Sequence, residues 1–482
     1  MVFSSCCGRR NSRFPLGQNQ KTPDNKRVFA SVLSTCLEVP ARLPVEKHRK
    51  MPKIASISAS RPQSQPRVIR ATLKIDELGR RGEGIAKGPE GPVFVPFALP
   101  GERIEADIEG DRGVLVALQQ ASPYRNRPPC PYFGRCGGCG LQHLDGSFYA
   151  QWKRSLIVSL LMKGGLAPLV HPLCEAHGAG RRRVVFHARH SSAGAALIGF
   201  MAARSHDIVS IDHCLVLVPE LQAAVAAAKD LAELFIAGTP AFDLQFTAVT
   251  NGIDCDVRGL NGSADSLTPA VADIALQHGI CRISIGGHPL VTLALPLVEF
   301  AGVGVVPPPS AFLQATTAGE QALTNFILSR VGASRRAADL FCGVGTFTFP
   351  LARRLPVLAV DSDARALDAL TLAYRKGMGL KPIGAQTRNL FREPLTASEL
   401  DGIDLVLFDP PRQGAEAQAK AIAASRCKRV IALSCDPVTF TRDASILAAG
   451  GYTLAEVLPV DQFQWSSHLE IAALFTRGSK LR

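Results

Sequence analysis

The stretch Val430-Ile431-Ala432-Leu433-Ser434-Cys435-Asp436-Pro437 decides how the C-terminal part of the chain is interpreted. Its first four residues are apolar and partly β-branched, which predicts a short buried strand over 430–433. The residues that follow carry Thr and Asp at positions suited to the start of a helix. A cysteine at the carboxyl end of a parallel strand lies where open α/β sheets bind their ligands. Cys435 is therefore a candidate nucleophile, and a packing thiol is the alternative.

Length and composition indicate a protein of several domains with no membrane partner. The chain has 482 residues, enough for about two to four domains, and 46% of them are hydrophobic. No apolar run reaches the roughly 18 residues that a membrane span requires. The net charge is +13, but residues 1–66 carry 12 Lys/Arg against 3 Asp/Glu. The other 416 residues hold only +4, so a nucleic-acid site must be a local patch.

The N-terminal segment and the cysteine content indicate the cellular compartment of the protein. The first 30 residues lack an apolar core segment, so no secretory signal is predicted, and we expect a cytoplasmic monomer in a reducing compartment. Clustered members of the 13 cysteines then indicate metal binding or catalysis. Residues 1–66 have three open interpretations: a disordered basic extension, an organelle transit peptide, or an over-long gene model whose true start is Met51.

Residues 67–124 are predicted to form a small β-barrel. Short alternating segments separated by glycine-rich turns predict strands, namely Arg70–Leu78, Gly91–Phe97, Glu102–Ile108 and Gly113–Gln119. Barrels of this size often bind nucleic acid through one face and its loops. Arg80, Arg81 and Lys87 in the turns favour such a contact over a purely structural barrel.

Three cysteines follow the barrel with the spacing C-x5-C-x2-C, at Cys130, Cys136 and Cys139. Glycines between them allow the chain to wrap a metal, and either an iron–sulfur cluster or zinc requires a fourth ligand. Cys214 is our choice for that ligand, and its rivals are Cys174 and His143. A structural or redox cluster is favoured, because the spacing differs from the C-x3-C-x2-C of radical chemistry with S-adenosylmethionine (SAM).

Residues 125–305 are predicted to form a mixed α/β central domain without a catalytic constellation. Strand-like stretches at Ala195–Met201 and Asp243–Thr250 flank an Ala-rich helix over Leu221–Ala237. The basic run Gly180–Phe186 has two open interpretations, a phosphate-binding edge or a solvated charge run.

Residues 306–482 predict a doubly wound sheet that binds a nucleoside. The segment Ala337–Thr348 reads as strand, Gly-rich turn and helix, and Asp361 follows Gly343 by 18 residues, the spacing of a ribose-binding acid. Thr348 replaces the third glycine of a dinucleotide fingerprint, which favours a ligand such as SAM. Further strand ends carry Asp409 and Cys435, and these loops converge at one crevice.

At this point the chain resembles the RNA uridine-5-methyltransferases, the SAM-dependent enzymes that make 5-methyluridine. The motifs are DLFCGVGTF at Asp339–Phe347, DPPR at Asp409–Arg412, SCDP at Ser434–Pro437 with Arg442-Asp443, and Asp461–Glu470 ending in HLE. The match covers residues 68–482. It implies a C-terminal Rossmann-like methyltransferase domain, an RNA-binding TRAM domain at the barrel, and a 4Fe–4S site at Cys130, Cys136, Cys139 and Cys214. The last two features favour 23S ribosomal RNA over transfer RNA as substrate.

The resemblance also implies site residues. Cys435 would be the nucleophile and Glu470 the base. Contacts to SAM would come from Gln314, Phe341, Thr346, Asp361, Asn389 and Asp409. Thr346 and Asp436 stand where asparagine is usual, which affects local hydrogen bonds, and Cys342 is interpreted as a packing residue.

Three alternatives remain at this stage: a transfer-RNA uridine-5-methyltransferase, a methyltransferase acting on RNA cytosine or another nucleophile, and a non-catalytic RNA-binding assembly factor that retains the fold. The second is weakened by a single Cys435 motif together with Glu470, and the third by the intact nucleophile, base and SAM motif.

Overall fold

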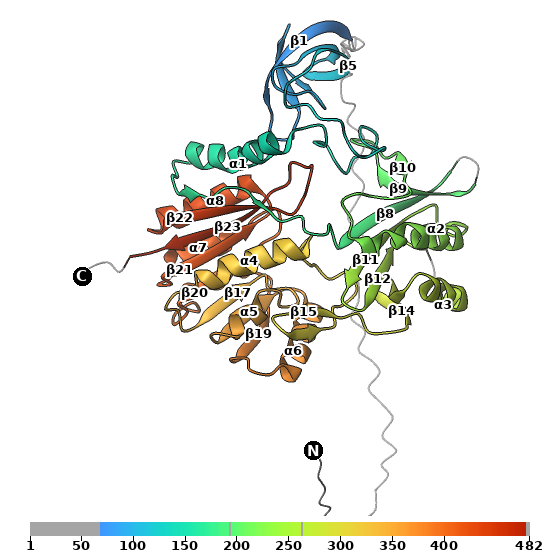
Figure 1. The fold of residues 1–482 in the computed structure, drawn as a ribbon. Helices are drawn as coiled ribbons and strands as arrows, with labels where there is room; N and C mark the ends of the chain where they lie inside the picture. The colour runs from blue at the N-terminus through green and yellow to red at the C-terminus, as the bar shows by residue number, and fades with distance from the viewer. Residues whose placement is uncertain (1–67, 192–193, 262–263, 479–482) are drawn as a thin grey trace, which may run out of the picture. The chain divides into compact units, whose positions relative to one another are not determined.

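The structure is a computed structural model that describes residues 68–191, 194–261 and 264–478. The predicted extension over 1–66 lies outside the described residues, so its interpretations stay predictions. Among the described residues, no helix is long and apolar enough to cross a membrane. They form a closed barrel, a seven-stranded sheet, a nine-stranded sheet and a two-stranded hairpin (Figure 1).

The barrel closes in the strand order β1-β2-β3-β5-β4. Its strands are β1 (Ile69–Leu78), β2 (Gly84–Gly88), β3 (Gly91–Val95), β4 (Arg103–Glu109) and β5 (Arg112–Gln120). The predicted small N-terminal β-barrel is thereby confirmed, with a fifth strand, β2, that was not expected. The interior of the barrel leaves room only for a small residue at Gly84 of β2, since a Cβ there would lie 2.8 Å from the Ala98 carbonyl oxygen. A strand that needs glycine at an inward position resembles a turn in sequence.

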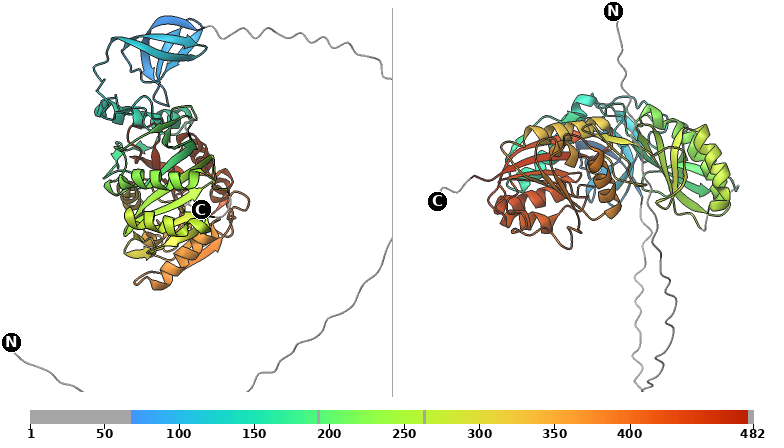
Figure 2. Two further views of the ribbon diagram at one scale, coloured as in Figure 1. Left: turned by 90° about the vertical axis from the view of Figure 1, so that its right-hand side faces the viewer. Right: turned by 90° about the horizontal axis from the view of Figure 1, so that it is seen from below.

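The seven-stranded sheet has the order β10-β9-β8-β11-β12-β13-β14. Its strands are β8 (Arg183–His190), β9 (Ala196–Met201), β10 (Ile208–Ser210), β11 (Ala241–Val249), β12 (Gly252–Arg258), β13 (Ile280–Ile285) and β14 (His288–Thr292). Helices α2 (Ala223–Ile236) and α3 (Thr268–Gln277) cover one face, as Figure 2 shows. Short 3-10 turns at Pro219–Leu221 and Asp265–Leu267 precede them, and the hairpin β15 (Val298–Phe300) and β16 (Val303–Val305) follows.

The nine-stranded sheet has the order β19-β18-β17-β20-β21-β23-β22-β6, with β7 also paired to β22. Its strands are β6 (Leu169–Val170), β7 (Cys174–Glu175), β17 (Ala337–Leu340), β18 (Val357–Asp361), β19 (Ile383–Thr387), β20 (Leu405–Phe408), β21 (Arg429–Ser434), β22 (Thr453–Asp461) and β23 (Glu470–Thr476). Strands β17 to β21 are mutually parallel, and β23 is antiparallel to both neighbours. The strand order reverses between β17 and β20, which creates the ligand crevice of an open α/β sheet.

Helices cover both faces of this sheet. They are α1 (Gly146–Lys163), α4 (Thr317–Ser329), α5 (Thr348–Ala352), α6 (Ala364–Lys376), α7 (Glu416–Ala424) and α8 (Pro437–Ala449). Alternate residues of β21 face opposite sides, with Val430 packed in the cluster that contains α1, α7 and α8 and Ile431 in the cluster that contains α4 and α5. A strand buried on both faces is apolar throughout, as the sequence indicated. The α/β fold class is confirmed.

Some segments connect regions that the sequence separated. Strands β6 and β7 lie within the range predicted for the central domain, yet both pair with β22. Arg182 is buried, donates from Nε to the Gln314 carbonyl oxygen at 2.9 Å and forms an ion pair with Glu320 of α4. At Arg182 the basic run is therefore an internal contact, and neither of its two predicted interpretations holds there. The domain boundaries stay a prediction.

Candidate active site and a cysteine-lined cavity

Parallel pairing brings three strand ends to one edge of the large sheet. Strands β17, β20 and β21 are neighbours, and each is followed by a motif: the turn after Leu340, Asp409 after Phe408, and Cys435 after Ser434. Strand β23 enters from the same edge, and Ser434 pairs with Ile471. Continuing that antiparallel register by one residue sets Cys435 opposite Glu470. The structure thus brings together four of the predicted loops.

The glycine-rich turn after β17 is held to β18 by Asp361. One carboxylate oxygen accepts the Gly343 N–H at 2.8 Å, and the other accepts the Asp363 N–H at 2.8 Å. Phe341 has a φ of +64°, uncommon for a non-glycine residue. Gly345 has a φ of +95°, and a Cβ there would lie 2.8 Å from the Phe349 ring. The missing third glycine does not prevent a tight turn, because Thr348 instead donates to the buried Asp339 carboxylate at 2.6 Å.

Gln314 reaches the same edge from the segment before α4. Its Nε2 donates to the Asp409 carboxylate at 3.3 Å, and its Oε1 accepts from Gln462 Nε2 at 2.8 Å. Gln462 in turn accepts the Thr316 N–H at 3.2 Å, so the orientation of both amides is determined. Gly319 makes room for this contact, since a Cβ there would lie 2.2 Å from Gln462 Cγ.

Two further predicted contacts have different surroundings. Thr346 is buried beside the turn, with 8% of its surface exposed. The side-chain oxygen of Asn389 accepts the backbone N–H groups of Phe391 at 3.1 Å and Arg392 at 3.3 Å. The Phe391 ring lies 5.3 Å from the Phe341 ring, between centroids. Asn389 therefore shapes the loop whose aromatic ring packs against the turn.

Burial and negative charge dominate the electrostatics of this edge. Burial, followed by the charges of Glu470 and Asp409, raises the pKa of the Cys435 thiol to about 12, against the lowering effect of Arg412. Burial and Asp409 raise the pKa of Glu470 well above its usual range. Burial also raises the pKa of Asp409 to about 7. In the free protein, burial therefore favours the protonated forms of Cys435, Glu470 and Asp409.

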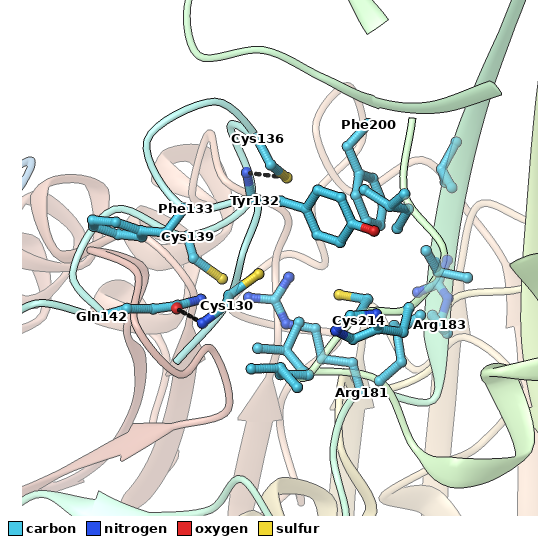
Figure 3. Close-up of a pocket in the computed structure, with 18 residues that line it drawn as sticks. Cys130, Tyr132, Phe133, Cys136, Cys139, Gln142, Arg181, Arg183, Phe200 and Cys214 are labelled. Atoms are coloured by element: carbon cyan, nitrogen blue, oxygen red, sulfur yellow. Dashed lines mark hydrogen bonds between the residues drawn. The ribbon is translucent and has the colours of Figure 1, made fainter. Parts of the chain in front are cut away.

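The four predicted cluster cysteines line one cavity of about 260 Å³. Figure 3 shows the thiols of Cys130, Cys136, Cys139 and Cys214 arranged around it. The rival ligands lie elsewhere, since Cys174 is in β7 and His143 is buried between the rings of Phe97 and Phe133.

Burial favours the neutral thiol form at three of the four cavity cysteines. Burial is the main cause that raises the pKa of Cys136, Cys139 and Cys214, the last to about 11. Within 68–191, 194–261 and 264–478, no three His, Cys, Asp or Glu side chains are close enough to hold a single metal ion.

Comparison with known proteins identifies the family. No family profile matches the chain. An uncharacterized RNA methyltransferase of Rhizobium meliloti is 42% identical over 408 residues, which are 83% of this chain and 98% of the relative. The 23S rRNA (uracil(1939)-C(5))-methyltransferase RlmD of Chromohalobacter salexigens is 32% identical over 84% of this chain and 89% of its own length. The chain belongs to the RNA uridine-5-methyltransferase family.

A solved structure agrees with this assignment at the level of the fold. The crystal structure of a Pyrococcus abyssi tRNA (uracil-54, C5)-methyltransferase in complex with S-adenosyl-L-homocysteine has a TM-score of 0.65 and 23% sequence identity to this family member. The match covers 84% of this chain and 99% of the archaeal chain. The methyltransferase fold with its N-terminal barrel is therefore shared along the described length.

Sequence reasoning missed a buried ionic network in this methyltransferase. Lys153 of α1 and Asp461 are fully buried and paired, and Asp461 also accepts from Tyr149 at 2.8 Å and lies 2.9 Å from His177. Although burial opposes ionisation, His177, Lys153 and Tyr149 lower the pKa of Asp461 to about 2. The sequence pattern that could have indicated part of this network is the i, i+4 spacing of Tyr149 and Lys153, which places both side chains on one face of a helix. The network anchors the start of the loop that leads to Glu470.

Proposed function

We propose that this protein is a SAM-dependent RNA (uracil-C5)-methyltransferase that makes 5-methyluridine in 23S ribosomal RNA. The observation that carries the proposal is the juxtaposition of one thiol and one carboxyl, Cys435 and Glu470, beside Asp409 at the edge of the sheet. A nucleophile and a base on the same site are what methylation at an unactivated vinylic carbon requires.

The residues around the turn fit a SAM site. Asp361 lies at the end of β18, where such folds bind a ribose, although both its oxygens already hold backbone N–H groups. We assign the nucleoside contacts to Phe341, Thr346, Asp361 and Asn389, and the contacts nearer the methyl group to Gln314 and Asp409. When bound, SAM supplies an electrophilic methyl group and a positive charge.

Cys435 would initiate the reaction by nucleophilic addition. Its thiolate forms a bond from Sγ to uracil C6, and the displaced electron pair makes C5 an enolate carbon able to take the methyl group. Since the thiol is protonated in the free protein, its proton must first pass to a base. Asp409 is suited to this step, because its carboxyl lies at the same edge of the sheet and its charge acts on the Cys435 thiol.

Glu470 would complete the reaction. After methylation, C5 carries both the new methyl group and its original hydrogen. Glu470 takes that proton, the electron pair forms the C5–C6 double bond, and the bond from C6 to Cys435 breaks with its electrons returning to sulfur. Because burial favours the protonated form of Glu470 in the free protein, Glu470 must release its own proton to solvent before this step, and burial then makes the carboxylate a strong base. Arg412 or Arg442 would stabilise the oxygen that gains charge during addition.

Two observations support the RNA assignment. The 32% identical relative is named for a uracil of 23S ribosomal RNA, and the five-stranded barrel, which we assign as a TRAM domain, suits contact with extruded, unpaired RNA. Transfer RNA is the second candidate, because the archaeal neighbour of similar fold is named for it. We assign the protein to the cytoplasm as a monomer.

The cysteine-lined cavity would hold a 4Fe–4S cluster. Zinc bonds of about 2.3 Å bring four sulfur atoms to within roughly 3.8 Å of one another. A cubane cluster carries its iron atoms at separate corners, so its ligands are farther apart. Four thiols around about 260 Å³, with glycine-rich backbone between three of them, fit the larger group.

A methylation map tests the function. 5-Methyluridine would be located in 23S and transfer RNA from cells with and without the gene, and purified protein with SAM would be added back. We expect loss of one ribosomal site, restored by the wild-type protein and not by Cys435→Ala. Loss confined to transfer RNA would overturn the substrate, and no loss anywhere would overturn uracil methylation in favour of cytosine or a non-catalytic role.

A further inference from the structure

The wall of the cysteine-lined cavity is positively charged. Arg181 and Arg183 line it together with the four thiols, and no Asp or Glu is among the residues that line it in the described chain. The Nε of Arg181 is buried and has no hydrogen-bond partner among the described residues. A buried donor that lacks a partner is costly.

The backbone holds Arg181 rigidly against the segment that follows Cys214. Its N–H donates to the Val216 carbonyl at 2.7 Å, and its own carbonyl accepts the Val218 N–H at 3.0 Å. Gly180 permits this approach, since it has a φ of +125° and a Cβ there would lie 2.7 Å from the carbonyl carbon of Leu217. The arginine is therefore fixed beside one of the proposed ligands. Burial raises the pKa of Cys139 and Cys214, and the charge of Arg181 acts against that rise.

The same side chain also contacts the loop that leads to Glu470. The Arg181 guanidinium lies over the Phe463 ring, 5.2 Å from its centroid, and that ring lies 5.8 Å from the ring of His468. A second link is provided by the cysteine segment itself, where the N–H groups of Gly140 and Leu141 both donate to the Trp465 carbonyl, at 2.9 and 3.0 Å. The cavity and the catalytic loop are thus in direct contact.

We propose that Arg181 is a positioning residue whose positive charge balances the negative charge of the cluster and which, through Phe463, holds the loop that carries Glu470. This inference rests on the proposed cluster and the proposed methylation. Four thiolates around an iron–sulfur core carry net negative charge, and reduction adds more. A fixed cation beside them favours the reduced form and raises the reduction potential. The cation over Phe463 connects that charge to the loop.

The test compares anaerobically purified variants of the full chain. Arg181→Gln removes the charge, Arg181→Lys keeps it, and Phe463→Leu removes only the aromatic partner. Arg135→Gln is the matched control, because Arg135 is an exposed arginine of the cysteine segment that does not line the cavity. Iron content, reduction potential, the rate of iron loss in air, kcat and KM are measured for each.

We expect Arg181→Gln to lower the reduction potential and to lose iron several-fold faster in air, with a several-fold fall in kcat and an unchanged KM for SAM. Arg181→Lys should keep the potential of the wild type, and Phe463→Leu should lower kcat without moving the potential. If Arg181→Gln matches Arg135→Gln in potential and iron retention, the inference is wrong. If Arg181→Gln does not fold, a shifted potential in Arg181→Lys or an unaltered kcat in Phe463→Leu overturns it.

The proposed function fails in a different way. A wild-type protein that contains no iron overturns the cluster and this inference with it, whereas a wild-type protein that holds iron but methylates no uracil overturns only the reaction. In that case, iron retention and reduction potential are still compared between Arg181→Gln and Arg135→Gln. That comparison tests the effect of the Arg181 charge on the cluster independently of methylation.

Discussion

Cys435 and the cysteines of the cavity are all partly buried thiols, yet their neighbours differ in charge. The side chains that act on Cys435 are mainly Glu470 and Asp409, which raise the pKa of its thiol together with burial. Arg181 acts on Cys139 and Cys214 in the opposite direction, and no carboxylate lines their cavity in the described residues.

The comparison shows how one residue type serves two purposes. A single thiol among acidic side chains stays protonated, and therefore unreactive, until a base takes its proton. Four thiols beside an arginine can become thiolates together when a cationic iron core neutralises them. Both kinds of thiol are partly buried, so burial does not distinguish a reactive thiol from a metal-binding thiol. The charge of the neighbouring side chains does distinguish them.

The largest expected effect comes from removing the nucleophile. Cys435→Ala should lower methyl transfer by about 10⁴-fold or more, because no other group on this edge can add to C6. The measurement is transfer of labelled methyl from SAM to RNA. Cys255→Ala, at a buried cysteine in the core of the seven-stranded sheet, is the control and should remain active. A Cys435→Ala enzyme of near wild-type rate would exclude covalent catalysis.

Removing the base should give a smaller effect and a distinct product. Glu470→Gln keeps the shape of the side chain but cannot take the C5 proton, so turnover should fall by about 10²- to 10⁴-fold. Methylated RNA should then remain bound to Cys435, visible as a complex that survives denaturing electrophoresis. Asp436→Asn, a change at the adjacent helix cap, is the comparison and should not accumulate adduct. Slow turnover without trapped RNA would assign proton removal to another group.

The pH dependence should separate the two kinds of thiol. With the pKa of Cys435 raised to about 12, the ionised fraction grows as pH rises and is lost as pH falls. If thiol ionisation limits the rate, kcat/KM should rise with pH between pH 6 and 9, since it reports the free enzyme, and should level off once Asp409, the proposed proton acceptor, is ionised. Iron content should stay level over the same range, because bound thiolates no longer titrate. A flat kcat/KM profile would contradict the electrostatic account.

The fourth ligand gives the smallest expected change in activity and a clear spectroscopic one. Cys214→Ser should lose most of the iron and the visible absorption of the protein, whereas Cys174→Ser should retain both because Cys174 does not line the cavity. Iron analysis and absorption spectra of anaerobic preparations decide between them. Equal loss in the two variants, or full iron in Cys214→Ser, would remove Cys214 from the ligand set.

Much of the fold could be predicted because its signals are local. The strand before Cys435 was expected over 430–433 and extends over Arg429–Ser434, and the strand predicted at the start of Ala337–Thr348 ends in its Gly-rich turn as predicted. Strand β2 was missed because small inward residues leave no apolar alternation. Strands β6 and β7 were missed because segments of two residues carry no period at all.

The sequence alone determined which side chains follow the strands, because a motif at a strand end is a local property. Parallel pairing of the strands then places those ends at one edge of the sheet. Only the tertiary structure decided what surrounds them. Lys153 and Asp461 are 308 residues apart and fully buried together, and Arg181 joins the cavity to a loop far along the chain. Charge states at Cys435 and Glu470 likewise depend on burial and on neighbours across strands, which no local pattern encodes.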